Sequence, residues 1–121
     1  MLIGIDIIDI DRVKKAVQRT PRILQRIYTA AERDYCMSKK NPYPSLAVRF
    51  AAKEAIRKLH PALSSCPWQD IEVILNPDGS PMLNLYGQAR RAQLQARLQS
   101  PSISLSHSAG QAMAAVVSAK G

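Results

Sequence analysis

Cysteines, aromatic residues and long apolar runs are scarce in this chain of 121 residues, and each scarcity excludes a class of protein. The two cysteines, Cys36 and Cys66, have neither CxxC spacing nor companion histidines, so no zinc site and no disulfide framework is indicated. The longest apolar run near the end covers residues 112–117, far below the ~20 residues that a membrane-spanning helix needs. No basic segment precedes Leu2, so we expect no secretory signal, reduced thiols and a cytoplasmic location.

Acidic residues are also few, because nine Asp and Glu stand against 17 Lys and Arg, giving a net charge of +8. This balance favours polyanionic partners: nucleic acid, an anionic membrane surface, a phosphorylated ligand or an acidic protein. A solvated basic face and a docking surface both remain open as explanations. The positive side chains are densest, with no acid among them, at Arg12, Lys14, Lys15, Arg19, Arg22 and Arg26.

The first half of the chain predicts one strand followed by helices. Residues Leu2–Ile10 are rich in isoleucine and predict a mostly buried strand with Asp6 inside it. A buried carboxylate is costly unless it is paired, hydrogen-bonded or bound to a metal. Apolar spacing then predicts two short basic helices, around residues 13–19 and 21–27. Two more helices are expected from a capping box at 29–32 toward Lys39, and over 46–59 with Ser45 as the cap.

The second half predicts two hairpins separated by a helix. Residues 70–75 and 82–86 flank the turn-forming sequence Asn-Pro-Asp-Gly-Ser-Pro, and residues 87–98 follow with helical spacing. Strands are expected over 102–108 and 112–119, joined at Ala109-Gly110. There is no alternating strand–helix–strand series. With 46% apolar residues, the composition and element order predict one domain over residues 1–121, of α+β class, with helices packed on a largely antiparallel sheet.

The helix expected from Ser45 has the most informative cluster of charges. Arg49, Lys53 and Arg57 recur at every fourth position and repel one another, so an anion held along this row would relieve the repulsion. Glu54 lies beside the row and is expected to pair with Lys58 four residues later. A surface helix with one ion pair would explain the same pattern.

Asp6 and Glu54 could meet around one hard cation, since Mg²⁺ binds one or two carboxylates and completes its octahedron with waters and phosphates. His107 lies among serines at the end of an expected strand, where ligand contact and simple packing are both open. No nucleophile elbow accompanies it, so a catalytic triad is disfavoured. The chain also lacks the glycine-rich phosphate loops of ordinary nucleotide-binding folds.

Four segments together resemble the short, holo-acyl-carrier-protein-synthase type of 4′-phosphopantetheinyl transferase. Residues 4–7 (GIDI), continuing to Arg12, resemble its opening strand and the basic helix that follows. Residues 49–55 (RFAAKEA), with Lys58, resemble its central helix. Residues 70–73 (DIEV) followed by 79–81 (GSP) resemble its hairpin, and residues 104–108 (SLSHS) resemble a late strand. All four occur in the family order across nearly the whole chain.

The resemblance implies the fold of that family and the transfer of 4′-phosphopantetheine from coenzyme A to a serine hydroxyl of an apo acyl carrier protein. It implies that Asp6 and Glu54 hold Mg²⁺, with Mn²⁺ as an alternative ion, and that Lys58 lies on the same phosphates. An acidic carrier protein would dock on Arg12, Arg19, Arg22 and Arg26, and the family implies a homotrimer with sites between subunits. The residues expected to contact coenzyme A are Arg49, Lys53, Lys58, Pro81 and His107.

The chain departs from the family after its central helix. Ile56 replaces an aromatic residue, and residues 60–66 (HPALSSC) replace a glycine-rich turn. This departure leaves open a catalytically silent member that binds a carrier without modifying it. A basic nucleic-acid-binding module is the other alternative, but the few aromatic residues are scattered and no such motif is present, so no nucleic acid is expected as a partner.

Overall fold

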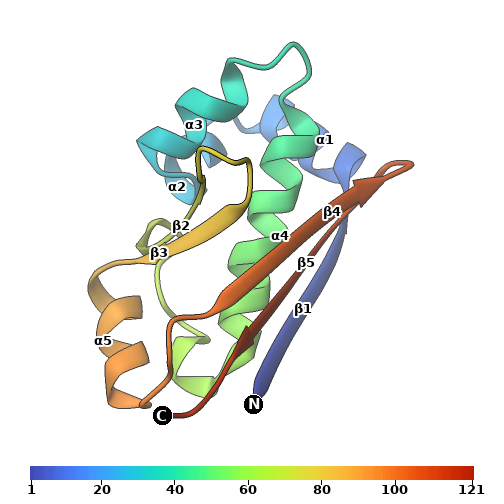
Figure 1. The fold of residues 1–121 in the computed structure, drawn as a ribbon. Coiled ribbons are helices and arrows are strands. Elements are labelled where there is room, and N and C mark those ends of the chain that lie inside the picture. The colour runs from blue at the N-terminus through green and yellow to red at the C-terminus, as the bar shows by residue number, and fades with distance from the viewer.

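One long helix, α4 (Tyr43–Leu59), lies at the centre of the computed structural model, which describes all residues from Met1 to Gly121 (Figure 1). None of the helices combines the length and apolar character that crossing a bilayer requires. The other helices are α1 (Ile10–Arg19), α2 (Ile23–Ile27), α3 (Ala30–Met37) and α5 (Gly87–Gln95), with 3₁₀ turns η1 (Pro61–Leu63) and η2 (Trp68–Asp70). The strands are β1 (Leu2–Asp9), β2 (Ile71–Leu75), β3 (Pro81–Leu85), β4 (Ser102–Ser108) and β5 (Gln111–Ser118).

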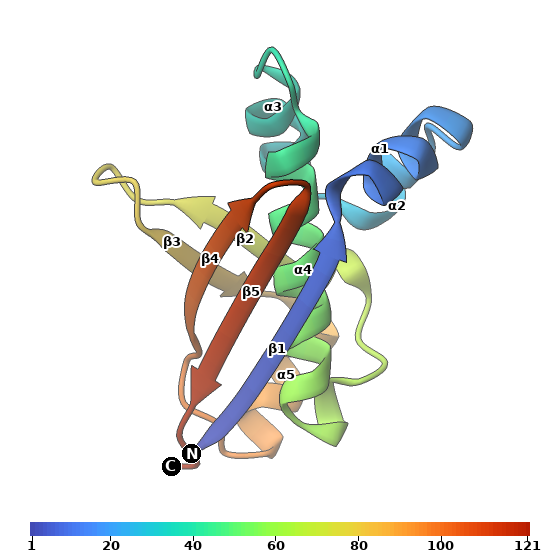
Figure 2. The same cartoon turned by 90° about the vertical axis from the view of Figure 1, so that its right-hand side faces the viewer.

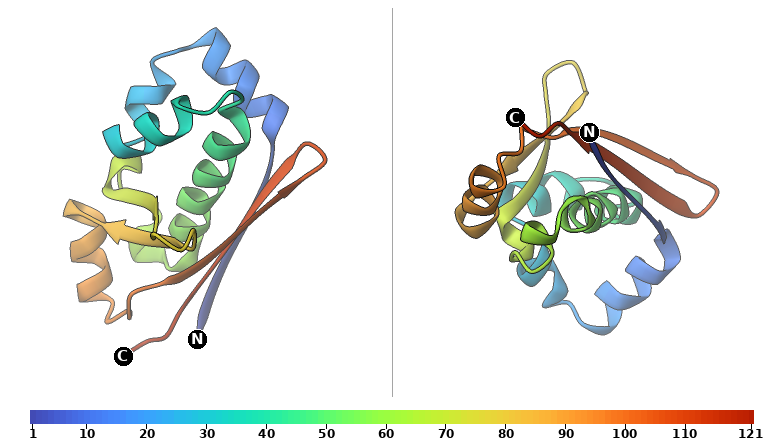
Figure 3. Two further views of the ribbon diagram at one scale, coloured as in Figure 1. Left: turned by 45° about the horizontal axis from the view of Figure 1, so that its top comes forward. Right: turned by 90° about the horizontal axis from the view of Figure 1, so that it is seen from below.

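The strands form two antiparallel sheets. The larger sheet has the order β1-β5-β4, so the first strand of the chain pairs with the last. The smaller sheet is the β2-β3 hairpin, which lies on the other side of α4 together with α5 (Figure 3). The antiparallel pairing and the helices packed against it confirm the α+β expectation.

The core forms where α4 meets both sheets. Its small side chains Ala51, Ala52 and Ala55 are completely buried, which lets the helix backbone come close to its neighbours. Ile56 fills the same core together with Ile71 of β2. A second group of buried side chains packs α1, α3 and the start of α4 together at the other end of the helix.

The expectation of a mostly buried first strand is wrong. Ile3, Ile5 and Ile7 are between 53% and 60% exposed, because they point to the face of the larger sheet opposite α4. Figure 2 shows that no helix of this chain covers that face. Strand periodicity places alternate residues on opposite faces, and only the inner face is covered here.

Three predicted boundaries can be compared directly with the structure. The capping box at Thr29 is confirmed, with its side chain accepting from the Glu32 backbone N–H. The helix expected to begin after Ser45 instead begins at Tyr43, because a proline in the first turn blocks no intrahelical hydrogen bond. The helix over 87–98 ends early, at Gln95, before Arg97 takes the left-handed conformation with φ 55°.

Candidate active site

Asp6 and Glu54 line the same cavity, although they are far apart in the sequence. The cavity has a volume of about 420 Å³ and lies between β1, α1, α2 and α4. Arg12 of α1 is the third charged residue on its wall, and the remaining lining is mostly apolar. The expected convergence of a strand carboxylate and a helix carboxylate is therefore seen in the structure.

A close contact between two backbones brings these carboxylates together. Gly4 lies two residues before Asp6 and faces α4 at Ala55, the residue after Glu54. A Cβ added at Gly4 would lie 2.1 Å from the Ala55 carbonyl oxygen, well inside any acceptable contact. Only glycine therefore allows β1 to approach α4 this closely, and this approach sets the separation of Asp6 and Glu54.

Each carboxylate in the cavity has a different cationic neighbour. Lys58 Nζ lies 2.7 Å from Asp6 Oδ1, and this hydrogen bond raises the pKa of the lysine. The Asp6 side chain is 13% exposed and that of Lys58 is 52% exposed, so a shielded carboxylate is paired with a solvated ammonium. The expected Glu54–Lys58 pair is wrong, because Glu54 instead faces Arg57, with 3.7 Å between Oε1 and Nη1.

The donor set fits a hard divalent ion. Glu54 accepts no hydrogen bond from protein, and Asp6 accepts one only from the exposed Lys58. No group of three or more His, Cys, Asp or Glu side chains gathers in the chain, so these two carboxylates are not joined by a third ligand of that kind. Two carboxylates suit an ion such as Mg²⁺, which takes its remaining ligands from water and phosphate.

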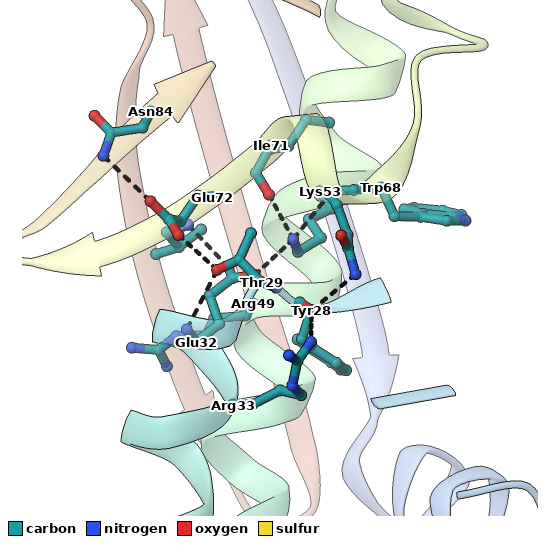
Figure 4. Close-up of polar contacts among 12 residues, drawn as sticks. Tyr28, Thr29, Glu32, Arg33, Arg49, Lys53, Trp68, Ile71, Glu72 and Asn84 are labelled. Atoms are coloured by element: carbon teal, nitrogen blue, oxygen red, sulfur yellow. Dashed lines mark hydrogen bonds and ion pairs between the residues drawn. The ribbon is translucent and has the colours of Figure 1, made fainter. Parts of the chain in front are cut away.

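Lys53 does not reach this cavity. Its side chain is completely buried, and its ammonium lies 2.7 Å from Glu32 Oε1 (Figure 4). It also donates to the carbonyl oxygens of Trp68 and Ile71. Burial lowers the pKa of Lys53, even though the neighbouring Glu32 favours the charged form. All three protons of the ammonium are thus used inside the fold, and this position does not fit the coenzyme A contact expected of Lys53.

A second buried carboxylate, Glu72 of β2, completes the network around Lys53. It accepts a hydrogen bond from Thr29 Oγ1 at 2.5 Å (Figure 4). It also accepts one from Tyr86 Oη at 2.8 Å. Burial by itself would raise the pKa of Glu72, but these hydrogen bonds bring it below its usual value. Glu32 accepts from the backbone N–H of Val73 at 2.9 Å, so α3, α4 and β2 are tied together by polar contacts.

Arg49 is also shielded in the single chain. Its guanidinium lies 4.6 Å from the ring of Tyr35 and donates to the Ser45 carbonyl, while its Nε is buried without a partner. Arg49, Lys53 and Arg57 therefore have three separate environments. No anion is therefore needed along this row to relieve the repulsion, because Glu32 already neutralises its middle member.

His107 and Pro81 lie outside the cavity of Asp6 and Glu54. His107 is exposed near the β4–β5 turn and lines a second cavity of about 230 Å³. Ile7 lines both cavities, so the two are close along β1. Pro81 begins β3 and lines neither. One copy of the chain therefore separates the residues that were expected to contact coenzyme A.

The basic side chains expected to dock a partner lie beside the cavity on α1 and α2. Arg12 reaches the cavity wall, and Arg19 is at the end of α1. Arg22 and Arg26 lie at the start and in the last turn of α2, and all four are exposed. This exposure agrees with a docking surface and equally with a solvated basic face.

Sequence reasoning misses two features of the site. The apolar wall has the signal of an ordinary helical stripe, which predicts core packing, and it includes Val13, Val17, Ile23, Ile27 and Phe50. The sequence also does not reveal the neighbours of Arg57, because Arg57 looks like one more member of the series of basic residues at every fourth position. Its contact with Glu54 is consistent with a spacing of three residues, but its contact with Trp68 depends on a chain crossing that the sequence does not encode locally.

Comparison with known proteins gives consistent sequence matches. The model of the 4′-phosphopantetheinyl transferase superfamily matches residues 2–116. A holo-[acyl-carrier-protein] synthase of Moorella thermoacetica is 44% identical over 105 residues, which is 86% of this chain and 82% of that protein. The enzyme of the same name from Caldanaerobacter subterraneus is 36% identical over 122 residues, covering 100% of this chain and 96% of that protein.

Solved structures agree with the sequence matches. The holo-[acyl-carrier-protein] synthase of Helicobacter pylori, crystallised with coenzyme A, superposes with a TM-score of 0.82 at 34% identity, covering 98% of this chain and 100% of that one. The Bacillus anthracis synthase, also in complex with coenzyme A, gives 0.77 at 31% identity, with coverage of 97% and 94%. These structures confirm the expected fold, and with the family match over residues 2–116 they show that the chain belongs to the 4′-phosphopantetheinyl transferase superfamily.

Proposed function

We propose that this chain is a holo-[acyl-carrier-protein] synthase, which transfers 4′-phosphopantetheine from coenzyme A to a serine hydroxyl of an apo acyl carrier protein. The observation that carries the proposal is that Asp6 and Glu54 lie on the wall of one cavity, with Lys58 hydrogen-bonded to Asp6. Relatives at 36–44% identity have this name, and similar structures contain coenzyme A. Carboxylates that can hold an ion, together with a nearby ammonium, suit the binding of a diphosphate.

The reaction is a phosphoryl transfer in which one P–O bond replaces another. The serine oxygen attacks the β-phosphorus of coenzyme A, and the bond from that phosphorus to the bridging oxygen breaks, which releases adenosine 3′,5′-bisphosphate. Mg²⁺ or Mn²⁺ held by Asp6 and Glu54 would neutralise charge that develops on the diphosphate. Lys58 has an exposed ammonium that can leave Asp6 for a phosphate oxygen. Glu54, or a water that it orients, accepts the serine proton.

The partner is an acidic acyl carrier protein that docks on α1 and α2. Arg12, Arg19, Arg22 and Arg26 place exposed positive charge directly beside the cavity. Electrostatic complementarity of this kind mainly speeds encounter and fixes orientation, and it weakens as salt rises. We place the reaction in the cytoplasm, where the two unpaired thiols of the chain remain reduced.

We further propose that residues 1–121 act as one domain in a homotrimer with sites between subunits. The outer face of the larger sheet exposes Ile3, Ile5, Ile7 and Met113, an apolar surface that suits burial against another copy. Assembly would also bring His107 and Pro81 of one copy toward the carboxylates of the next. This arrangement would reunite the coenzyme A contacts that one chain keeps apart.

Mass spectrometry of an apo carrier protein incubated with this protein, coenzyme A and Mg²⁺ tests the proposal. The carrier should gain one phosphopantetheine group, and omission of the divalent ion should abolish the gain. Fatty-acid, polyketide and peptide carriers should all be tried. Binding to a carrier without any gain in mass would favour the catalytically silent alternative, and absence of both would reject the function.

A further inference from the structure

Arg57 is held in place by residues that come from outside α4. Its guanidinium lies 4.0 Å from the ring of Trp68, and its Nε donates to the Ser64 carbonyl at 3.1 Å. Trp68 is itself packed against Phe50, with 5.3 Å between ring centroids. Ser64 belongs to the segment 60–66 that follows α4, so Arg57 is tied to a part of the chain beyond its own helix.

The contact between Arg57 and Glu54 is electrostatic without being a hydrogen bond. The 3.7 Å separation of Nη1 and Oε1 is too long for one. The lone pairs of Glu54 therefore remain free for another ligand, while a positive charge stays beside them. Side-chain exposures of 25% for Arg57 and 31% for Glu54 mean that water screens this charge only partly.

The charges of Asp6, Glu54, Lys58 and Arg57 balance before any ligand binds. Asp6 is matched by Lys58 and Glu54 by Arg57. A divalent ion alone would add two positive charges to a site that already has Lys58, Arg57 and, on the cavity wall, Arg12. A diphosphate brings two negative charges, so the ion and the diphosphate together leave the net charge of the site unchanged. Lys58 is exposed and free to move, whereas Arg57 is fixed by Trp68 and Ser64.

We propose that Arg57, fixed beside Glu54, makes divalent-ion binding conditional on the diphosphate of coenzyme A. This inference rests on the proposed function, because it needs a diphosphate substrate at the Asp6–Glu54 cavity. The Arg57 charge opposes the ion when the ion binds alone and attracts the diphosphate when both bind. Arg57 is thus a positioning and coupling residue, and each ligand must strengthen the binding of the other by the same factor.

Two titrations on the intact protein test the coupling. Electron paramagnetic resonance measures Mn²⁺ binding without coenzyme A, and calorimetry measures coenzyme A binding at saturating Mg²⁺. Arg57→Gln should tighten Mn²⁺ binding and weaken coenzyme A binding, each by about threefold to tenfold, the size expected for one partly screened charge. Arg57→Lys should restore most of both effects because it keeps the charge. Arg91→Gln, an exposed position on α5, is the matched control for net charge and should change neither.

The direction of the two changes distinguishes coupling from a structural role. A merely structural Arg57 would weaken both ligands or neither, and either result overturns the inference, as would a failure of Arg57→Lys to recover the wild-type values. Circular dichroism confirms that each variant is folded. If the wild-type protein transfers phosphopantetheine while Arg57→Gln binds both ligands normally, the inference fails and the proposed function stands. If the wild-type protein binds no coenzyme A, both fail.

Discussion

Lys53 and Glu54 are neighbours in α4, yet their surroundings are opposite. Lys53 points into the interior, where Glu32 and two backbone carbonyls take all of its protons (Figure 4). Glu54 points into the cavity, where it has a cation nearby and no hydrogen bond from protein. All protons of the Lys53 ammonium are therefore used within the fold, whereas the carboxylate of Glu54 remains available to a ligand.

The difference shows how one helix serves both stability and chemistry. Polar groups in the interior must be fully satisfied, because an unpaired buried charge costs several kcal/mol. Polar groups at the cavity must exchange partners, and the exposed Lys58 makes such an exchange with Asp6 feasible. Charge alone does not distinguish these roles, since both positions lie in the same charged segment.

The largest expected effect comes from replacing Lys53, the residue whose partners all lie within the fold. Lys53→Met leaves Glu32 buried without its cation and should lower the free energy of unfolding by about 3–5 kcal/mol. The same substitution at Lys58, which is half exposed, should cost no more than about 1 kcal/mol of stability. Urea denaturation of both variants measures the contrast. Equal losses of stability would show that the two lysines do not differ as described.

Replacing a carboxylate of the cavity should affect activity rather than stability. Asp6→Asn or Glu54→Gln removes a charge that holds the ion and should lower kcat/KM for phosphopantetheine transfer by about 10²–10³-fold, or about 3–4 kcal/mol. The thermal midpoint should change little. Asp34→Asn, an exposed acid on α3, is the matched control and should keep full activity. Activity within a few-fold of wild type in both site variants would remove the basis of the proposed mechanism.

Much of this fold could be predicted, because its signals are local. The capping box at Thr29, the turn after Leu75 and the helical spacing around Val48 depend on residues a few positions apart. The convergence of Asp6 and Glu54 could be suspected only from the resemblance and the cost of burying Asp6. The Lys53–Glu32 pair could not be foreseen, because it depends on how α3 packs against α4.

The exposed outer face of the larger sheet shows the same limit of prediction from the sequence. The isoleucines of β1 predicted a strand correctly, but their burial depends on what covers each face of the sheet. The hydropathy of a single chain does not reveal whether a sheet face is covered by its own helices or by another copy. The local sequence pattern therefore predicts that β1 is a strand, whereas the packing of the whole molecule decides whether its side chains are buried.

A substitution at Gly4 should lower both stability and activity, each to a smaller extent than the substitutions above. Gly4→Ala places a Cβ against the Ala55 carbonyl and pushes β1 away from α4. The free energy of unfolding should fall by about 1–3 kcal/mol. Transfer activity measured well below the melting temperature should fall too, because Asp6 and Glu54 move apart.

Gly79→Ala is the matched control for this effect. Gly79 lies in an exposed turn with φ 88°, and no atom lies within 4 Å of the place a Cβ would take, so alanine there strains only the local backbone. It should cost about 1 kcal/mol of stability and leave activity unchanged. If Gly4→Ala behaved in the same way, the close approach of β1 and α4 would not control the site.

The smallest expected effect is a pH dependence of stability from Glu72. Its pKa is below the ordinary value of 4.5 in the folded chain, so its ionised form stabilises the fold above pH 4.5. This stabilisation is lost as the pH falls below 4.5 through the pKa of the folded state. Thermal melts between pH 3 and 7 should show a steeper decline for wild type than for Glu72→Gln. Parallel curves would mean that Glu72 does not contribute in this way.

A crystal structure of this protein with Mg²⁺ and coenzyme A tests the account most directly. We expect oxygens of Asp6 and Glu54 at about 2.0–2.1 Å from one ion that also contacts the diphosphate. We also expect Lys58 to have left Asp6 for a phosphate oxygen, and Lys53 to remain on Glu32. An ion held elsewhere, or Lys53 turned out of the interior onto a phosphate, would contradict this contrast between Lys53 and Glu54.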